Sequence, residues 1–425
     1  PVPLPATVPD RLTVTLWDFS WYVRTGPGEP FEDLDRAFTE AADRGYNTIR
    51  ICAMPFLLFG SGLDTTRLRL GPLGGGRGSR VRWYDVRAET VIDGRAHLLA
   101  LFRAARRHDF HVIPSSWEYQ QSPVFAGDRR WLDALTAVEP ERRPEALADA
   151  LADLIDFLAA HDGLDDRIAF TELHNEVQAG RLTESLDGDP VGAVPTVLAL
   201  RPRLERGLAR FRARRPDHPV TVNYAAVPVG AMRGVPRDID VAVFHPYVHG
   251  VLDEMIDTFA LRDPARPFPQ ERAAQELLVP SAPSLEDWKP SADDAWREEA
   301  TLVSPREMYL HQWCDPVKWD AWLYDRHAVH RLAMEQRLVT WIDAAADLAA
   351  DLGVPLLFGE GWVGYTPLHG TFEEGPVGAA LCRRAMEESV RVGALGAVVC
   401  SNAAPHHPMW ADVELQRECN ALLRG

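Results

Sequence analysis

Eight short, strongly apolar segments recur along the chain, and most are followed by a stretch with helical spacing. These segments are 11–19, 46–53, 110–116, 167–173, 220–224, 241–246, 355–360 and 396–401. Most are too apolar for a sheet with one wet face, which is typical of buried parallel strands. Strands that alternate with helices predict a parallel α/β sheet built from βα units.

The segments between these strands carry apolar residues on one face. Between the third and fourth strands, Leu147, Leu151, Leu154, Ile155 and Leu158 recur at steps of three and four, as in an amphipathic helix. Similar faces occur in 31–44, 97–107, 196–215, 328–351, 378–392 and 410–423, whereas 230–236 has room for one turn only. No G-x-G-x-x-G turn follows the first strand, which argues against a dinucleotide fold. Eight strands with helices between them therefore favour a closed (β/α)₈ TIM barrel, a single catalytic domain over residues 1–425.

Two connections are much longer than usual, and such loops are usually functional. Residues 55–93, after strand two, hold a Gly-rich tip and the segments VRWYDV and ETVID, which we expect to pair as a hairpin. The tip lacks the Gly-Lys-Ser/Thr ending of a phosphate-binding loop. Residues 248–324, after strand six, are rich in Pro and predict a lid. Its tryptophans are Trp288, Trp296, Trp313, Trp319 and Trp322.

Composition excludes several classes of partner. A formal net charge of −17 argues against nucleic acid, because that binding depends on clustered cations. The sequence contains no apolar run of about 18 residues, so it predicts no membrane-spanning helix. The five cysteines are dispersed without a C-x-x-C pair, so we expect reduced core thiols, which favour a cytoplasmic protein. An export signal removed before residue 1 would instead make the protein secreted, and the oligomeric state stays open.

Polar and aromatic residues gather at the ends of six predicted strands, where a (β/α)₈ barrel holds its catalytic groups. The candidates are Trp17, Asp18, Trp21, Arg50, Trp117, Glu118, Gln120, His174, Asn175, Glu176, His245, Tyr247, Glu360 and Trp362. One polar strand end is ordinary, but six on one rim predict a site. Each tryptophan has packing in the core or rim as its alternative.

Glu176 and Glu360 follow strands four and seven, which face each other across the mouth of such a barrel. This pair suits glycoside cleavage, in which one carboxylic acid protonates the leaving oxygen and an ionised carboxylate attacks the sugar carbon. Tryptophan rings pack well on the apolar faces of sugars. The rings placed for this are Trp17, Trp21, Trp117 and Trp362.

The motifs ELHNE, LLFGEGW, IRICAMP and FHPY resemble those of the cellulase-like, family-5-type retaining glycoside hydrolases of the large (β/α)₈ clan. The resemblance implies that Glu176 is the acid/base and Glu360 the nucleophile. It also implies that Asn175 bonds the sugar 2-hydroxyl and that Arg50 keeps Glu360 ionised. Tyr247 would bond Glu360, and His245 would line the same wall. The implied partner is a carbohydrate, and no cofactor or metal ion is expected.

The chain departs from that family at three strand ends. His174 stands where the family often has Trp, and Ser116-Trp117-Glu118 where a His is usual. Strand eight ends in Cys400-Ser401-Asn402, with Trp410 only later, where the family usually has a Trp. These changes indicate a divergent branch and leave the substrate open.

The insertions favour a pocket, so we expect a retaining, exo-acting β-glycosidase on oligosaccharides or glycosides, with Asp18, Glu118 or Gln120 at the terminal sugar. An endo-acting β-glucanase is the nearest alternative. A metal-dependent sugar isomerase or lyase and a sugar-binding protein without catalysis also stay open. The metal ligands would be Glu176, His245, Glu360 and His174. His406-His407, flanked by prolines, are expected in a solvated turn.

Overall fold

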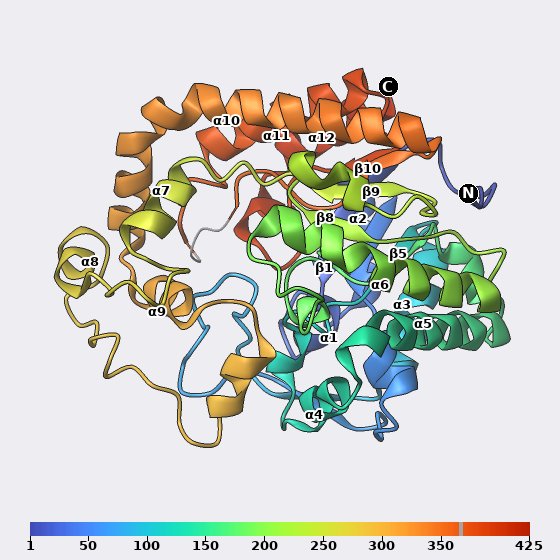
Figure 1. Cartoon of the computed structure of the whole chain (residues 1–425), viewed down its shortest axis with the longest axis horizontal. Coiled ribbons are helices and arrows are strands. Elements are labelled where there is room, and N and C mark those ends of the chain that lie inside the picture. Colours follow the sequence, from blue (N-terminus) through green and yellow to red (C-terminus); the bar gives the residue numbers. More distant parts are fainter. Residues whose placement is uncertain (365–368) are drawn as a thin grey trace.

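The computed structural model describes residues 1–364 and 369–425, and its centre is a curled parallel sheet (Figure 1). Seven strands lie in the order β5-β2-β1-β11-β10-β9-β8. They are β1 (Leu12–Asp18), β2 (Thr48–Cys52), β5 (His111–Ser115), β8 (Asn223–Ala225), β9 (Ala242–His245), β10 (Leu356–Phe358) and β11 (Gly396–Val398). Strands β6 (Thr171–Glu172) and β7 (Val220–Thr221) form a separate parallel pair. The predicted α/β class with a parallel sheet is confirmed, and each of the eight predicted segments contains strand.

Helices follow most strands and surround the sheet (Figure 1). They are α2 (Leu34–Asp43), α3 (Gly94–Arg107), α5 (Arg143–Ala160), α6 (Ala193–Arg214), α10 (Pro316–Leu352), α11 (Pro376–Arg391) and α12 (Val413–Arg424). Helices α2 and α3 each begin after an aspartate, Asp33 and Asp93, whose side chain accepts a hydrogen bond from the first-turn backbone. The five apolar residues predicted for one face of α5 are all buried.

Shorter elements connect these layers. After the fifth strand, the 3₁₀ helix η6 (Val229–Gly234) confirms the expected short turn. The others are α1 (Ser20–Val23), η2 (Ser122–Phe125), α4 (Arg130–Thr136), η3 (Pro140–Arg142), η4 (Leu164–Arg167), η5 (Arg181–Thr183) and η8 (Pro408–Ala411). Within the described part of the chain, no helix combines the length and apolar character needed to cross a bilayer. All five cysteines are buried and free, as expected for core thiols.

The insertion at 55–93 folds differently from its prediction. It begins with the π-helix η1 (Phe56–Gly60), and its antiparallel pair joins β3 (Leu68–Leu70) to β4 (Thr90–Ile92). The predicted pairing of 81–86 with 89–93 is therefore wrong. Val81, Arg82 and Tyr84 turn into the interior instead, where each is at most 1% exposed.

About half of the insertion at 248–324 is helical. It contains α7 (Val251–Thr258), α8 (Gln270–Glu276), η7 (Ala295–Ala300), α9 (Pro305–Trp313) and the start of α10. Helix α10 begins at Pro316, well before the predicted 328, because Asp315 caps it and proline suits a first helical position. Two of the predicted lid tryptophans, Trp319 and Trp322, are buried on this helix.

The two insertions are joined to each other through Arg77. Its guanidinium carbon lies 3.8 Å from the centre of the Trp288 ring, and Nη2 forms a 2.7 Å ion pair with Glu298. Nη1 also donates to the carbonyl oxygen of Trp288. One side chain from 55–93 thus makes three contacts with 248–324.

Candidate active site

Arg50, on β2, is fully buried and is the hub of a polar network. Its Nη1 donates to Glu360 Oε1 at 2.9 Å and its Nη2 to Asn175 Oδ1 at 2.6 Å. Nε and Nη2 also bind Glu172 Oε2, at 3.0 and 2.8 Å. Burial opposes the charge, but Glu172 and Glu360 outweigh it and raise the pKa of Arg50. Arg50 is therefore a permanent cation beside Glu360, where the resemblance placed it.

Sequence reasoning missed Glu172, which is also fully buried. A charged residue inside the apolar run RIAFTEL was the available signal, because such residues are rarely buried without a partner.

Glu176 and Glu360 come close together with His245 between them. One ring nitrogen of His245 and one carboxyl oxygen of each glutamate all lie within 4.8 Å of one another. The His245 Nδ1 atom is 3.0 Å from Glu176 Oε1 and 3.7 Å from Glu360 Oε1. Burial lowers the pKa of His245 to about 4, so the ring is neutral near pH 7. The predicted pair of carboxyl groups is therefore brought together in space.

The two carboxyl groups have different neighbours. Glu176 Oε2 accepts from the Gln120 amide at 3.0 Å, whereas Glu360 Oε2 accepts from the Tyr247 hydroxyl at 2.8 Å. Burial raises the pKa of both groups. Among the residues that the structure describes, a cation directly contacts Glu360 alone of the two; this cation is Arg50, which favours the ionised form of Glu360. The Tyr247 hydroxyl is in turn 2.5 Å from Ser401 Oγ, at the end of the eighth strand segment.

Both carboxyl groups line a cavity of about 610 Å³. Asp18, Trp117, Gln120, Asn175 and Tyr247 share its wall, as predicted. The insertions contribute further lining residues that sequence reasoning did not single out. They are Trp83 from 55–93 and His249, Asp253, Arg262, Leu302, Val303, Ser304, Glu307 and His311 from 248–324. The insertions thus form part of the cavity wall.

Three of the four tryptophans expected to face a sugar do not line this cavity. Trp17 is buried against Phe31 and Phe38, and Trp21 donates to the Cys52 carbonyl. Trp362 is 1% exposed and donates to the carbonyl oxygen of Val399. These three predictions are corrected to core packing. Trp117 does line the cavity, and its ring centre lies 4.7 Å from the Arg50 guanidinium carbon.

His174 and Glu118 are also corrected, because both are engaged away from the cavity. His174 Nε2 accepts from the Tyr119 backbone N–H at 3.0 Å, and its Nδ1 is 2.6 Å from the Asn175 carbonyl oxygen. Burial lowers the pKa of His174 to about 3, so the ring stays neutral as this acceptor. The imidazole holds the third strand end against the fourth.

Glu118 receives four hydrogen bonds. The donors are the backbone N–H groups of Phe56 and Leu57, the Ser116 hydroxyl and the Trp131 indole. Its carboxylate therefore anchors the first turn of η1 to the third strand end and is not free to bind a sugar.

We expect Glu118→Ala to lower the free energy of unfolding by about 2–4 kcal/mol, because it leaves buried donors without an acceptor. Denaturant unfolding measures this, with the exposed Glu286→Ala as control. Equal stabilities of the two variants would contradict the anchoring role.

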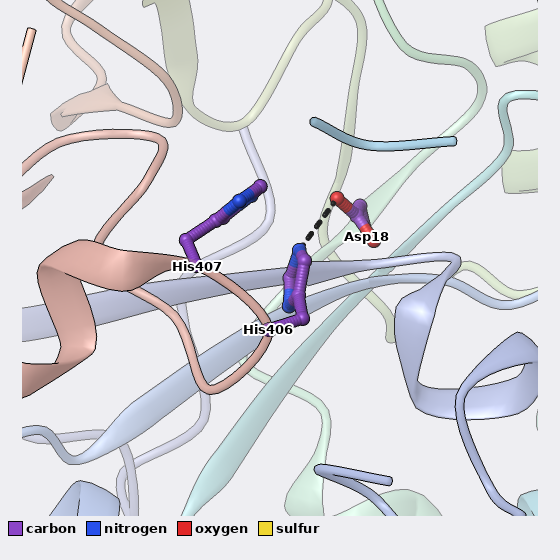
Figure 2. Close-up of side chains that lie close together, drawn as sticks. All are labelled: Asp18, His406 and His407. Atoms are coloured by element: carbon purple, nitrogen blue, oxygen red, sulfur yellow. Dashed lines mark hydrogen bonds and ion pairs between the residues drawn. The ribbon is translucent and has the colours of Figure 1, made fainter. Parts of the chain in front are cut away.

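His406 and His407 lie in no solvated turn. They are 8% and 7% exposed, and His406 Nε2 is 3.2 Å from Asp18 Oδ2 (Figure 2). His407 lines the same cavity as Asp18. This correction depends on a contact across 388 residues, which a local sequence pattern does not reveal.

Comparison with known proteins agrees with this architecture. A family model described as sugar-binding cellulase-like matches residues 14–72. A candidate glycoside hydrolase from Parabacteroides distasonis ATCC 8503 is 19% identical with a TM-score of 0.66, over 98% of this chain and 94% of that one. No protein of curated function matches the sequence.

Two endo-mannanases give weaker likenesses. The Rhizomucor miehei enzyme is 10% identical with a TM-score of 0.46, over 94% of this chain and 88% of that one. The Thermotoga petrophila enzyme is 13% identical with a TM-score of 0.44, over 97% and 77%. The predicted resemblance to the cellulase-like family is thus confirmed in residues 14–72, and the whole chain shares its fold with the Parabacteroides protein.

Proposed function

We propose that this protein is a retaining β-glycosidase that removes terminal sugars from oligosaccharides or glycosides. The observation that carries the proposal is the closeness of Glu176 and Glu360, with oxygens less than 4.8 Å apart in one cavity. Carboxyl groups about 5–5.5 Å apart suit double displacement, whereas inverting enzymes need about 6.5–9.5 Å to admit a water.

The neighbours of each carboxyl group support the assignment of roles. Glu360, in contact with Arg50 and Tyr247, attacks the anomeric carbon as a carboxylate. Glu176, which has no direct cationic partner among the described residues, protonates the leaving oxygen. It then takes a proton from the water that releases the sugar from Glu360. Asn175, on the cavity wall beside both, is placed for the 2-hydroxyl of the bound sugar.

The proposal includes a closed eight-stranded barrel. An isolated parallel bridge between Val112 and Ile168 links the third and fourth strand segments, and β6 pairs with β7. Strand β8 follows β7 after one residue and pairs with β9. Together with the seven-stranded order, these contacts support closure between β5 and β8 through the fourth and fifth segments.

Exo action is supported by the walls that 55–93 and 248–324 add to the cavity, since an enclosed first subsite suits a chain end. A panel of nitrophenyl β-glycosides tests the activity, and NMR of the first-formed anomer tests the stereochemistry. We expect one glycoside to be cleaved with a β product. Rapid viscosity loss of a soluble β-glucan with little monosaccharide would overturn exo action. Calorimetric binding of glycosides that stay uncleaved would indicate a sugar-binding protein.

The pH profile tests the proton assignment. Because burial raises the pKa of Glu176, kcat/KM should fall on the alkaline side only above the ordinary glutamate range. On an aryl glycoside whose leaving group needs no proton, Glu176→Gln should remove this alkaline limb and keep the acid limb. An unchanged alkaline limb in that variant would assign the acid to another group.

Metal-dependent sugar isomerisation is the second candidate, because Glu176, His245 and Glu360 cluster closely enough to share an ion. Two observations count against it: the Arg50 guanidinium already occupies one side of Glu360, and His174, the fourth proposed ligand, binds backbone groups. Retention of activity after exhaustive chelation would dismiss it, whereas recovery with added manganese would favour it.

A further inference from the structure

A second cluster of metal-ligating side chains lies on the cavity wall, apart from the catalytic carboxylates. Asp18 ends β1, and His406 and His407 directly precede η8. One carboxylate oxygen of Asp18 and one ring nitrogen of each histidine all lie within 4.8 Å of one another. Figure 2 shows the His406 ring directed at Asp18 with His407 beside it, and the two ring centres are 4.0 Å apart. Two distant parts of the chain thus build a three-ligand arrangement.

The two histidines have unused hydrogen-bonding capacity. Nδ1 of His407 is buried without a hydrogen-bond partner among the described residues, and so is Nδ1 of His406, although the His406 atom that faces Asp18 is Nε2. A buried polar atom left unpaired costs free energy, so native proteins rarely keep one without a reason. His407 is also more than nine-tenths buried yet lines the cavity, and Asp18 shares that wall. The cluster therefore faces a space where a ligand can arrive.

We propose that Asp18, His406 and His407 form a binding site for a divalent transition-metal ion of the Zn²⁺ type. Two imidazoles and one carboxylate match the ligands that zinc prefers, whereas magnesium and calcium prefer oxygen alone. Ligands about 2.0 Å from a tetrahedral ion are about 3.3 Å apart, and His406 Nε2 is 3.2 Å from Asp18 Oδ2. Three protein ligands leave one coordination position for an oxygen from the cavity.

The charges around the cluster are of both signs. Two cations, Arg24 and Arg82, act electrostatically on both histidines, and Asp18 acts on His406 with the opposite sign. The ion pair with Glu374 offsets the charge of Arg82, whereas Arg24 donates to the Arg82 carbonyl oxygen and keeps its charge. Glu373, 4% exposed, lines the same cavity as Asp18 and His407.

An ion here would bind oxygen atoms of a ligand in the same cavity as Glu176 and Glu360. Vicinal sugar hydroxyls and carboxylates are the ligand groups that fit its open position. The metal site is independent of the glycosidase proposal, because ion binding is measured without any sugar.

The test is calorimetric titration of the chelator-treated full chain with Zn²⁺ alone, with elemental analysis after dialysis. We expect one ion per chain, and at least tenfold weaker binding in the near-isosteric Asp18→Asn and in His407→Gln. Glu176→Gln and Glu360→Gln are the matched controls, because they alter the other cluster and should bind the ion unchanged. Circular dichroism confirms that each variant is folded.

X-ray absorption of the zinc-loaded wild-type protein gives a readout that needs no variant. Two imidazoles in the first coordination shell are expected, whereas the Glu176–His245–Glu360 cluster offers only one. Absence of a bound ion, binding that survives both substitutions, or a single imidazole would each overturn the proposal.

Discussion

Glu360→Gln is expected to lower kcat for glycoside cleavage by about 10⁴-fold or more, because the amide cannot form the glycosyl ester with the sugar. Glu176→Gln should cost about 10²–10⁴-fold, and less on substrates whose leaving group needs no proton. Thermal unfolding should change little for either variant. Steady-state kinetics on the glycoside that the wild type cleaves gives both values.

Azide separates the two roles. With Glu176→Ala, azide can replace the activated water and release a β-glycosyl azide, the product of two inversions. With Glu360→Ala, it attacks the sugar directly and gives the α-glycosyl azide. NMR of the products distinguishes them. If the two variants gave azide products of the opposite stereochemistry, Glu176 would be the nucleophile and Glu360 the acid/base. Full activity of either Gln variant would remove that residue from the mechanism.

Arg50→Met is expected to be the most destabilising single change at the site, by about 3–5 kcal/mol. It leaves Glu172 fully buried without its cation, and breaking one side of a buried ion pair is strongly unfavourable. The double variant Arg50→Met/Glu172→Gln should recover part of this loss, because no unpaired charge remains. Denaturant unfolding of the wild type, Arg50→Met and the double variant measures their free energies of unfolding.

The matched control for Arg50 is Arg69→Met, which breaks an exposed ion pair with Glu89. Exposed pairs contribute little, so its stability should stay close to that of the wild type. If the double variant were no more stable than Arg50→Met alone, the burial of an unpaired Glu172 would not explain the loss.

The architecture was predictable where a local pattern decides it. Apolar runs located all eight strand segments, and the spacing of leucines located α5. The start of α10 was missed because Asp315-Pro316 lies within a Pro-rich segment that otherwise looks like a loop. The hairpin prediction paired 81–86 with 89–93, whereas the strand that pairs with 90–92 is 68–70. A local pattern could not show this, because strand pairing depends on which residues reach the interior, as Tyr84 does.

The convergence of the candidate catalytic groups was predictable because strand ends converge in a parallel α/β fold. Arg50, Asn175, Glu176 and Glu360 meet as the motifs indicated. The direction in which a large ring points was not predictable, because Trp17 and Trp362 fit the same sequence pattern whether they face a sugar or the core. Nor was the environment of His406, which depends on a residue at the opposite end of the chain.

The contacts of Arg77 with Trp288 and Glu298 bear on how the cavity wall can be altered. Since one guanidinium ties 55–93 to 248–324, altering either insertion disturbs the support of the other. The two segments are therefore a single unit for loop grafting. Under the proposed glycosidase function, exchange with a glycosidase of the same fold should transfer specificity when both segments are moved together with the Arg77 contacts. It should yield poorly assembled chimeras when they are moved one at a time.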